Sequence, residues 1–178
     1  GGIGSGKTTV ANYLKSMGIP VYNADDEAKK IMYYPEIMQI LKEQFGKEIF
    51  YNNILNRQKL SKIVFNNPEK LHQLNKIVHP AVKNHFDNWI LEHTKFPMVF
   101  KEAAILFESG SYKYCDSVIT VTSPLELRIQ RVMRRDNTKR ENVLSRINNQ
   151  WTDEQRIGKS DHVINNTTVK ETYLQLDE

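Results

Sequence analysis

The first eight residues carry the clearest chemical pattern in the chain. Residues 1–8 match G-x-x-x-x-G-K-[ST], the pattern of a phosphate-binding loop. Its glycines let backbone N–H groups turn around phosphate oxygens, its lysine reaches the β- and γ-phosphates, and the next hydroxyl binds Mg²⁺. A flexible glycine-rich terminus is the alternative, and the helical pattern that follows argues against it. The expected nucleotide contacts are Gly2, Ile3, Gly4, Ser5, Gly6, Lys7, Thr8 and Thr9, with Thr8 as the metal ligand.

If the loop serves phosphoryl transfer to a hydroxyl, the protein also needs a carboxylate. This group orients the attacking oxygen and accepts its proton. Asp25 follows an expected strand at 19–22, and ligands bind at the carboxyl edge of such sheets. Asp25 or Asp26 could instead cap the next helix, and the residues alone leave both roles open. Glu102, after the apolar run from Met98, is either a carboxylate on the Mg²⁺ side or a rim residue without a role.

Positive charge is concentrated late in the chain. The formal net charge is +4, yet residues 128–140 alone carry +5. So short a cationic stretch suits a small polyanion such as a nucleotide better than a long nucleic-acid backbone. A solvated charged face is the common meaning of such a run, but clustered arginines repel one another without an anionic partner, so we favour phosphate binding. The arginines concerned are Arg128, Arg131, Arg134, Arg135 and Arg140.

The elements that must position these groups alternate between strands and helices, which indicates an α/β fold with a parallel sheet core flanked by helices. Expected helices cover 9–17, much of 25–93 and the segments after 123, 138 and 152, where capping-box spacings occur. Gly18, Gly46, the Asn67-Pro68 pair and Pro80 are the expected stops. The expected strands cover 19–22, 98–103, 117–121 and 162–165, and a last helix covers 168–176.

Size and missing motifs narrow the class of nucleotide-binding protein. With 178 residues, one compact domain is expected, too small for helicase-like or transporter ATPases, and the guanine-reading motif Asn-Lys-x-Asp does not occur. A small-molecule kinase whose basic segment closes over ATP as a lid fits best. The sequence contains no stretch long and apolar enough for a membrane span, and its single cysteine, Cys115, makes a reducing cytoplasm the default location. Because no Met opens the sequence, we expect a native segment before Gly1.

Six motifs in order resemble the dephospho-CoA kinase family over essentially the whole chain. They are the phosphate loop, Asn23-Ala24-Asp25 for the D-A-D signature, residues 74–80 for L-N-x-I-x-H-P, residues 106–108 for the end of P-L-L-F-E, residues 131–141 for the lid pattern with Arg146 and Gln150 after it, and residues 161–166 for D-x-V-I-x-N. The departures are Asn23 for the first aspartate of D-A-D, Ala104 for proline and Thr167 for glycine.

This resemblance implies a P-loop kinase fold that phosphorylates the ribose 3′-hydroxyl of dephospho-CoA with ATP and Mg²⁺, without nucleic-acid or membrane partners. It implies a nucleotide-binding core at 1–24 and 94–178, a lid at about 128–150, and a helical substrate-binding insertion at 25–93. Asp25, Lys7 and Arg140 are then catalytic; Arg134, Arg135, Arg140 and Asn165 contact ATP; and Asp25, His79, Leu106, Phe107 and Glu108 contact the acceptor. Another small-molecule kinase or a nucleoside monophosphate kinase is the alternative. The sequence has no Asp-Gly pair and therefore lacks the D-G-x-P-R motif of the nucleoside monophosphate kinases. A non-catalytic nucleotide-binding module is a further alternative.

Overall fold

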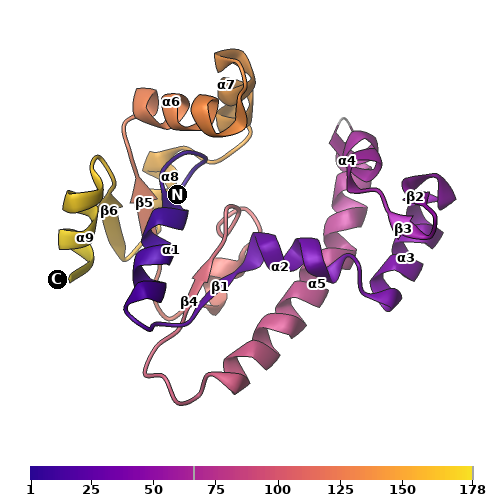
Figure 1. The fold of residues 1–178 in the computed structure, drawn as a ribbon, viewed down its shortest axis with the longest axis horizontal. Coiled ribbons are helices and arrows are strands. Elements are labelled where there is room, and N and C mark those ends of the chain that lie inside the picture. The colour runs from indigo at the N-terminus through magenta and orange to yellow at the C-terminus, as the bar shows by residue number, and fades with distance from the viewer. Residues whose placement is uncertain (66, 178) are drawn as a thin grey trace. The chain divides into compact units, whose positions relative to one another are not determined.

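The computed structural model describes residues 1–65 and 67–177. The chain divides into two compact units: unit 1 comprises Gly1–Val21 with Glu102–Glu178, and unit 2 comprises Tyr22–Lys101 (Figure 1). No helix in the described ranges is long and apolar enough to cross a membrane.

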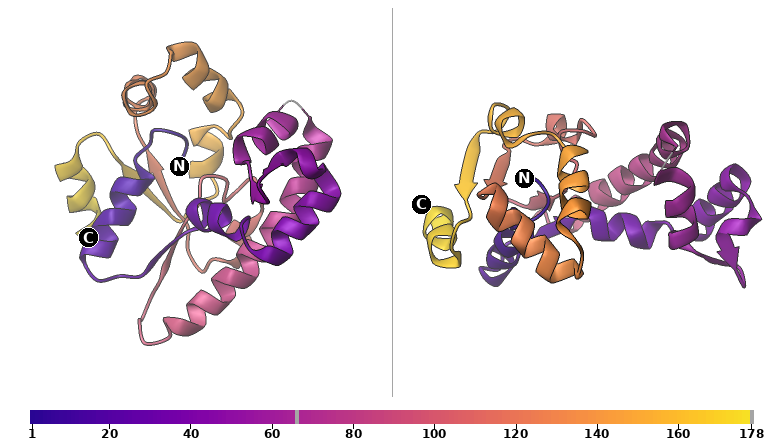
Figure 2. Two further views of the ribbon diagram at one scale, coloured as in Figure 1. Left: turned by 45° about the vertical axis from the view of Figure 1, so that its right-hand side comes forward. Right: turned by 90° about the horizontal axis from the view of Figure 1, so that it is seen from above.

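Unit 1 contains a pair of parallel strands with helices around it. Strands β5 (Ile119–Thr122) and β6 (His162–Asn165) pair from Ile119 opposite His162 to Thr122 opposite Asn165, and Figure 2 shows them side by side. Helix α1 packs on α9 through Tyr13 and Tyr173, whose rings stack at 3.9 Å between centroids. The helices of this unit are α1 (Lys7–Ser16), the 3₁₀ turn η2 (Ser111–Tyr114), α6 (Leu125–Asp136), α7 (Arg140–Asn148), α8 (Asp153–Ile157) and α9 (Val169–Asp177).

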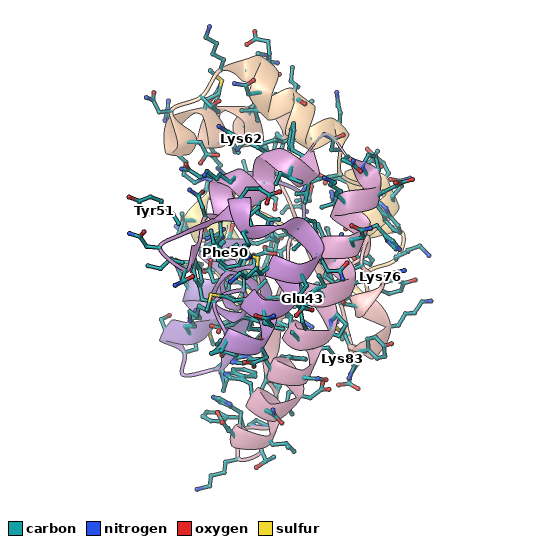
Figure 3. The ribbon with its side chains drawn as sticks, turned by 90° about the vertical axis from the view of Figure 1, so that its right-hand side faces the viewer. Glu43, Phe50, Tyr51, Lys62, Lys76 and Lys83 are labelled. Atoms are coloured by element: carbon teal, nitrogen blue, oxygen red, sulfur yellow. The ribbon has the colours of Figure 1, made fainter. Side chains whose placement is uncertain are left out.

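Unit 2 is mainly helical, as expected for this stretch, and has its own hydrophobic core. Leu41 and Ile49 are fully buried there, and Ile31 and Leu60 nearly so. The lysines labelled in Figure 3, Lys62, Lys76 and Lys83, are exposed on α4 and α5. The elements are β1 (Val21–Asn23), α2 (Ala24–Ile31), α3 (Pro35–Phe45), η1 (Lys47–Ile49), β2 (Phe50–Tyr51), β3 (Ile54–Leu55), α4 (Arg57–Phe65), α5 (Pro68–Glu92) and β4 (Phe100–Glu102).

The fold class is confirmed, but two features of unit 2 differ from expectation. A short antiparallel hairpin joins β2 to β3 through Asn52 and Asn53, which both have positive φ. Asparagine tolerates this left-handed conformation, and two such residues in a row form the type I′ turn that suits a two-residue hairpin loop. Pro80 does not stop a helix, because it lies inside the 25-residue α5. Packing of α5 against α2, α3 and α4 outweighs the hydrogen bond that proline removes.

Some of the predicted helix ends are confirmed and others are wrong. Gly18 ends α1 with φ +80°, and the Ile19 N–H donates to the Leu14 carbonyl at 3.1 Å, so the predicted stop is confirmed. The capping box at Thr152 is also present. Those predicted at Ser123 and Thr138 are wrong, since α6 and α7 begin after Pro124 and Lys139 without a side-chain cap. The Ser123 hydroxyl instead accepts from Arg131, and the Thr138 hydroxyl accepts from Asn142.

Within the described ranges, each strand pairs with one other strand. β5 pairs with β6, and β1 pairs with β4. The beginning of the chain lies against β5, because a Cβ added to Gly1 would stand 1.9 Å from the Val121 carbonyl oxygen. The backbone of the phosphate loop therefore reaches β5 directly.

Candidate active site

The phosphate loop leads directly into α1, with Gly6 as the N-cap residue. The first turn of α1 therefore presents backbone N–H groups and the positive end of the helix dipole, which together favour a phosphate. Lys7 Nζ lies 3.4 Å from the Gly2 carbonyl oxygen, so the lysine folds back over the loop. Thr8 is exposed in the first turn, where its hydroxyl fits the expected Mg²⁺ ligand.

Two loop glycines are required by neighbouring protein atoms as well as by phosphate chemistry. Gly4 has φ +76°, and an added Cβ would stand 2.6 Å from the Arg128 carbonyl oxygen. Gly6 has φ +94°, and an added Cβ would stand 1.7 Å from Asn166 Nδ2. The loop is therefore packed closely between α6 and the segment after β6.

Three side chains distant in sequence hold the loop backbone. The Ile3 N–H donates to Gln150 Oε1 at 2.8 Å, and Arg128 Nε donates to the Ile3 carbonyl at 3.0 Å. Asn166 Nδ2 donates to the Ser5 carbonyl at 2.8 Å and is itself held through Oδ1 by the Thr172 hydroxyl. These bonds satisfy outward-facing polar groups of the loop and define its shape before any ligand binds.

A buried ionic network lies behind this arrangement. Arg128 and Arg156 are 5% and 1% exposed, and both donate to Asp153, at 2.9 and 3.2 Å. Arg156 also reaches Glu108 at 3.2 Å, and the Thr122 hydroxyl donates to Asp153 at 2.8 Å. Because buried guanidinium groups need compensating carboxylates, Asp153 is the centre of the network.

The network corrects the prediction that Arg128 belongs to the phosphate-binding arginines. Its guanidinium is buried and occupied by Asp153 and Ile3, so its role is to support the loop. Its place in the first turn of α6 turns it toward the loop, whereas the sequence showed only that it shares a helical face with other arginines.

The other basic residues of the segment predicted as a lid, residues 128–150 (the lid segment), lie nearer the surface. Arg140 pairs with Glu126, and its guanidinium lowers the pKa of that carboxyl group. Arg135 pairs with Asp136 and lowers its pKa in the same way, with Arg146 assisting. Within the described ranges, the Arg134 side chain makes no hydrogen bond or ion pair. These exchangeable surface pairs leave the arginines able to turn toward an anion.

Asp25 follows β1 in the first turn of α2 and does not cap that helix. The N-cap is Asn23, whose side chain accepts from the Asp26 N–H at 3.0 Å. The alternative that Asp25 or Asp26 caps this helix is therefore excluded. Asparagine and aspartate cap helices equally well, which explains why Asn23 can replace the first aspartate of the D-A-D signature.

The other residues predicted for the acceptor lie in different settings. His79 is exposed on α5 in unit 2. In unit 1 Phe107 is buried against the Trp151 ring, with 5.7 Å between centroids, and Glu108 accepts from the Trp151 N–H and from Arg156. Leu106 is half-buried beside them. The segment 106–108 is thus joined to the network around Asp153.

Asn165, predicted to contact ATP, has its backbone bound by the Gln175 side chain. It lines a hollow of about 800 Å³ at the carboxyl ends of β5 and β6, with Trp151, Arg128 and Gln150. Since Arg128 and Gln150 also bind Ile3, the hollow adjoins the phosphate loop.

Comparison with known proteins gives a consistent result. The family model described as dephospho-CoA kinase matches residues 1–171. The chain belongs to the dephospho-CoA kinase family. The dephospho-CoA kinase of Bacteroides fragilis is 38% identical over 179 residues, covering 100% of this chain and 87% of that protein.

Two solved structures resemble the fold of this dephospho-CoA kinase family member. The crystal structure of TT1252 from Thermus thermophilus has a TM-score of 0.90 at 35% identity, covering 99% of this chain and 90% of that one. The dephospho-CoA kinase from Campylobacter jejuni has a TM-score of 0.69 at 29% identity, covering 97% and 90%.

Sequence reasoning did not assign Gln150, Asn166 or Asp153 to the site of this family member. Gln150 and Asn166 were noted within motifs, but their contacts with Ile3 and Ser5 cross 147 and 161 residues. The only local signal was the position of Asp153 next to the capping residue Thr152, which places its carboxylate at the start of α8.

Replacing Asp153 tests the buried network. We expect Asp153→Asn to lower the free energy of unfolding by about 3 kcal/mol, because two buried guanidinium groups lose their shared carboxylate. Urea denaturation measures the change. Asp87→Asn, which breaks the exposed Lys83–Asp87 pair, is the control and should cost below about 1 kcal/mol. Equal effects of the two changes would contradict the central role of Asp153.

Alanine at Gly6 tests the packing of the loop. Gly6→Ala should destabilise the protein by about 1 kcal/mol through its positive φ and further through collision with Asn166. Gly18→Ala is the matched control, because Gly18 has φ +80° with no atom within 4 Å of an added Cβ. If denaturation shows equal losses, contact with Asn166 does not constrain Gly6.

Proposed function

We propose that the chain transfers the γ-phosphoryl group of ATP to the ribose 3′-hydroxyl of dephospho-CoA, giving CoA and ADP, the last step of CoA synthesis. The observation that carries the proposal is the family match over residues 1–171, which includes a complete G-x-x-x-x-G-K-T loop at the start of α1. The reaction is phosphoryl transfer to an alcohol group, and its needs match the residues present.

The nucleotide side of the reaction is assigned to unit 1. Lys7 and the loop amides bind the transferring phosphate and neutralise the charge that develops on its oxygens. The Thr8 hydroxyl would hold Mg²⁺, which would neutralise part of the negative charge on the phosphate oxygens. The lid arginines Arg134, Arg135 and Arg140 contact ATP, and Arg140 exchanges its surface pair with Glu126 for the phosphate.

The acceptor side is assigned to Asp25, His79 and the segment 106–108. Asp25 accepts the proton of the 3′-hydroxyl while that oxygen forms a bond to the γ-phosphorus, and the bond from this phosphorus to the β–γ bridging oxygen breaks to release ADP. Support for Asp25 comes from its position after β1 and from the capping of α2 by Asn23 instead.

We further assign residues 25–93 to binding of the CoA-like substrate and residues 1–24 and 94–178 to the nucleotide core and lid. A cytoplasmic location is proposed because the sequence has a single cysteine, Cys115, which cannot form a disulfide within the chain.

The acceptor assay tests this function. ADP release from ATP and Mg²⁺ is measured with dephospho-CoA, with AMP and without acceptor. We expect dephospho-CoA alone to stimulate release. Stimulation by AMP would instead indicate a nucleoside monophosphate kinase, and bound ATP without stimulation would indicate a non-catalytic nucleotide-binding module.

Asp25→Asn tests the proposed base. We expect kcat to fall about 10²- to 10⁴-fold with little change in either KM, because the variant keeps the shape but cannot accept the proton. Asp26→Asn is the control, since Asp26 is a neighbouring exposed carboxylate paired with Lys29. A near-normal rate for Asp25→Asn in steady-state kinetics would remove Asp25 from this role.

A further inference from the structure

Gln150 lies where the lid segment returns to the body of unit 1. It follows α7, and its own N–H donates to the Ile147 carbonyl at 3.0 Å, so the end of the helix holds its backbone. The next residue, Trp151, is held through its N–H by Glu108 and through its ring by Phe107. The Gln150 side chain therefore extends from a fixed backbone and is half-buried.

The Gln150 side chain binds the one part of the loop that is also bound by the start of the lid. Its Oε1 accepts the Ile3 N–H at 2.8 Å, and Arg128 in the first turn of α6 donates to the Ile3 carbonyl at 3.0 Å. Both backbone polar groups of Ile3 are thus bound, one by Arg128 near the start of α6 and the other by Gln150 just after α7. Any movement of residues 129–149 must take place between these two anchors.

This arrangement divides the loop amides into two groups. The Ile3 N–H is taken by Gln150, and the Ser5 N–H turns back to the Gly2 carbonyl at 3.2 Å. Within the described ranges, the N–H groups of Gly4, Gly6 and Thr8 have no acceptor and remain available to phosphate oxygens. The bond from Gln150 therefore fixes the Gly2–Ile3 peptide plane immediately before these groups.

We propose that Gln150 is a positioning residue for ATP: its carbonyl oxygen holds Ile3 so that the following loop amides are preorganised for phosphate, and it couples that loop to the end of the lid. In this role Gln150 acts through Ile3. The inference rests on the proposed function only for the nucleotide-binding role of the loop. Losing the bond should weaken nucleotide binding selectively, because the acceptor is assigned to other residues.

Two variants at the same position separate the accepted hydrogen bond from the shape of the side chain. Gln150→Met keeps the length but removes the acceptor oxygen, and loss of one such bond corresponds to about a 5-fold weaker affinity. Gln150→Glu keeps an acceptor oxygen but adds a negative charge, so the variants and the unaltered protein are compared at about 0.5 M salt, where that charge is screened. We expect the Met variant to bind Mg·ADP about 5-fold more weakly and the Glu variant to stay within about 2-fold of the unaltered protein.

Calorimetric titration with Mg·ADP measures this affinity, and steady-state kinetics gives the separate KM values for ATP and dephospho-CoA. In the Met variant the KM for ATP should rise about 5-fold while that for dephospho-CoA stays constant. Because the titration needs no acceptor, it is decisive even if dephospho-CoA proves not to be the substrate, so failure of the proposed function is recognised separately.

Asn67→Ala is the matched control for a purely structural effect. Asn67 also accepts a backbone N–H, that of Lys70 at 3.0 Å, but it caps α5 in unit 2. Its loss should lower the thermal midpoint by about 2–4 °C and leave Mg·ADP affinity unchanged. The proposal is overturned if the Met variant binds Mg·ADP normally, if the Met and Glu variants lose affinity equally, or if Asn67→Ala loses as much as the Met variant.

Discussion

The shared carboxylate of Asp153 is the interaction on which the nucleotide side of the structure depends. Two buried guanidinium groups, those of Arg128 and Arg156, converge on it. In a low-dielectric interior each would be costly alone, whereas together with Asp153 and Glu108 they form a compensated cluster. The cluster joins β5, α6 and α8, and through Arg128 it extends to the backbone of the phosphate loop.

The loop is consequently supported by protein atoms on several sides. Asn166 supports it from the segment after β6, and Gln150 and Arg128 support it from the two ends of the lid. Such preorganisation matters for phosphoryl transfer, because the enzyme contributes mainly by placing fixed dipoles and charges where the phosphate charge develops. The loop glycines serve both purposes, since their missing side chains leave room for Asn166 and α6.

The arginines of the predicted lid segment differ in how firmly the structure holds them. Arg128 is buried and committed to the loop, whereas Arg135 and Arg140 are paired with carboxylates at the surface. Surface pairs contribute little to stability and exchange readily. A phosphate can therefore replace Asp136 or Glu126 as the partner, while Arg128 stays where the fold needs it.

Local sequence signals determined much of the fold and the chemistry of the loop. The phosphate-loop pattern, the end of α1 at Gly18 and the capping box at Thr152 were all readable from neighbouring residues, because each depends on backbone conformation over a few positions. The family resemblance extended this to activity. The predicted contacts with ATP and the acceptor remain proposals, and the role of Asp25 gained support when Asn23 proved to be the cap.

Tertiary structure alone decided which side chains hold the loop and which arginines are buried. Gln150 and Asn166 reach residues 147 and 161 positions away, and no local pattern encodes contacts of that separation. For the same reason Ser123 and Thr138 met other partners than the helix ends nearest to them, and Pro80 was accommodated by the packing of α5. A local pattern states what a residue is able to do, and the neighbours that the fold brings to it determine which of these options is realised.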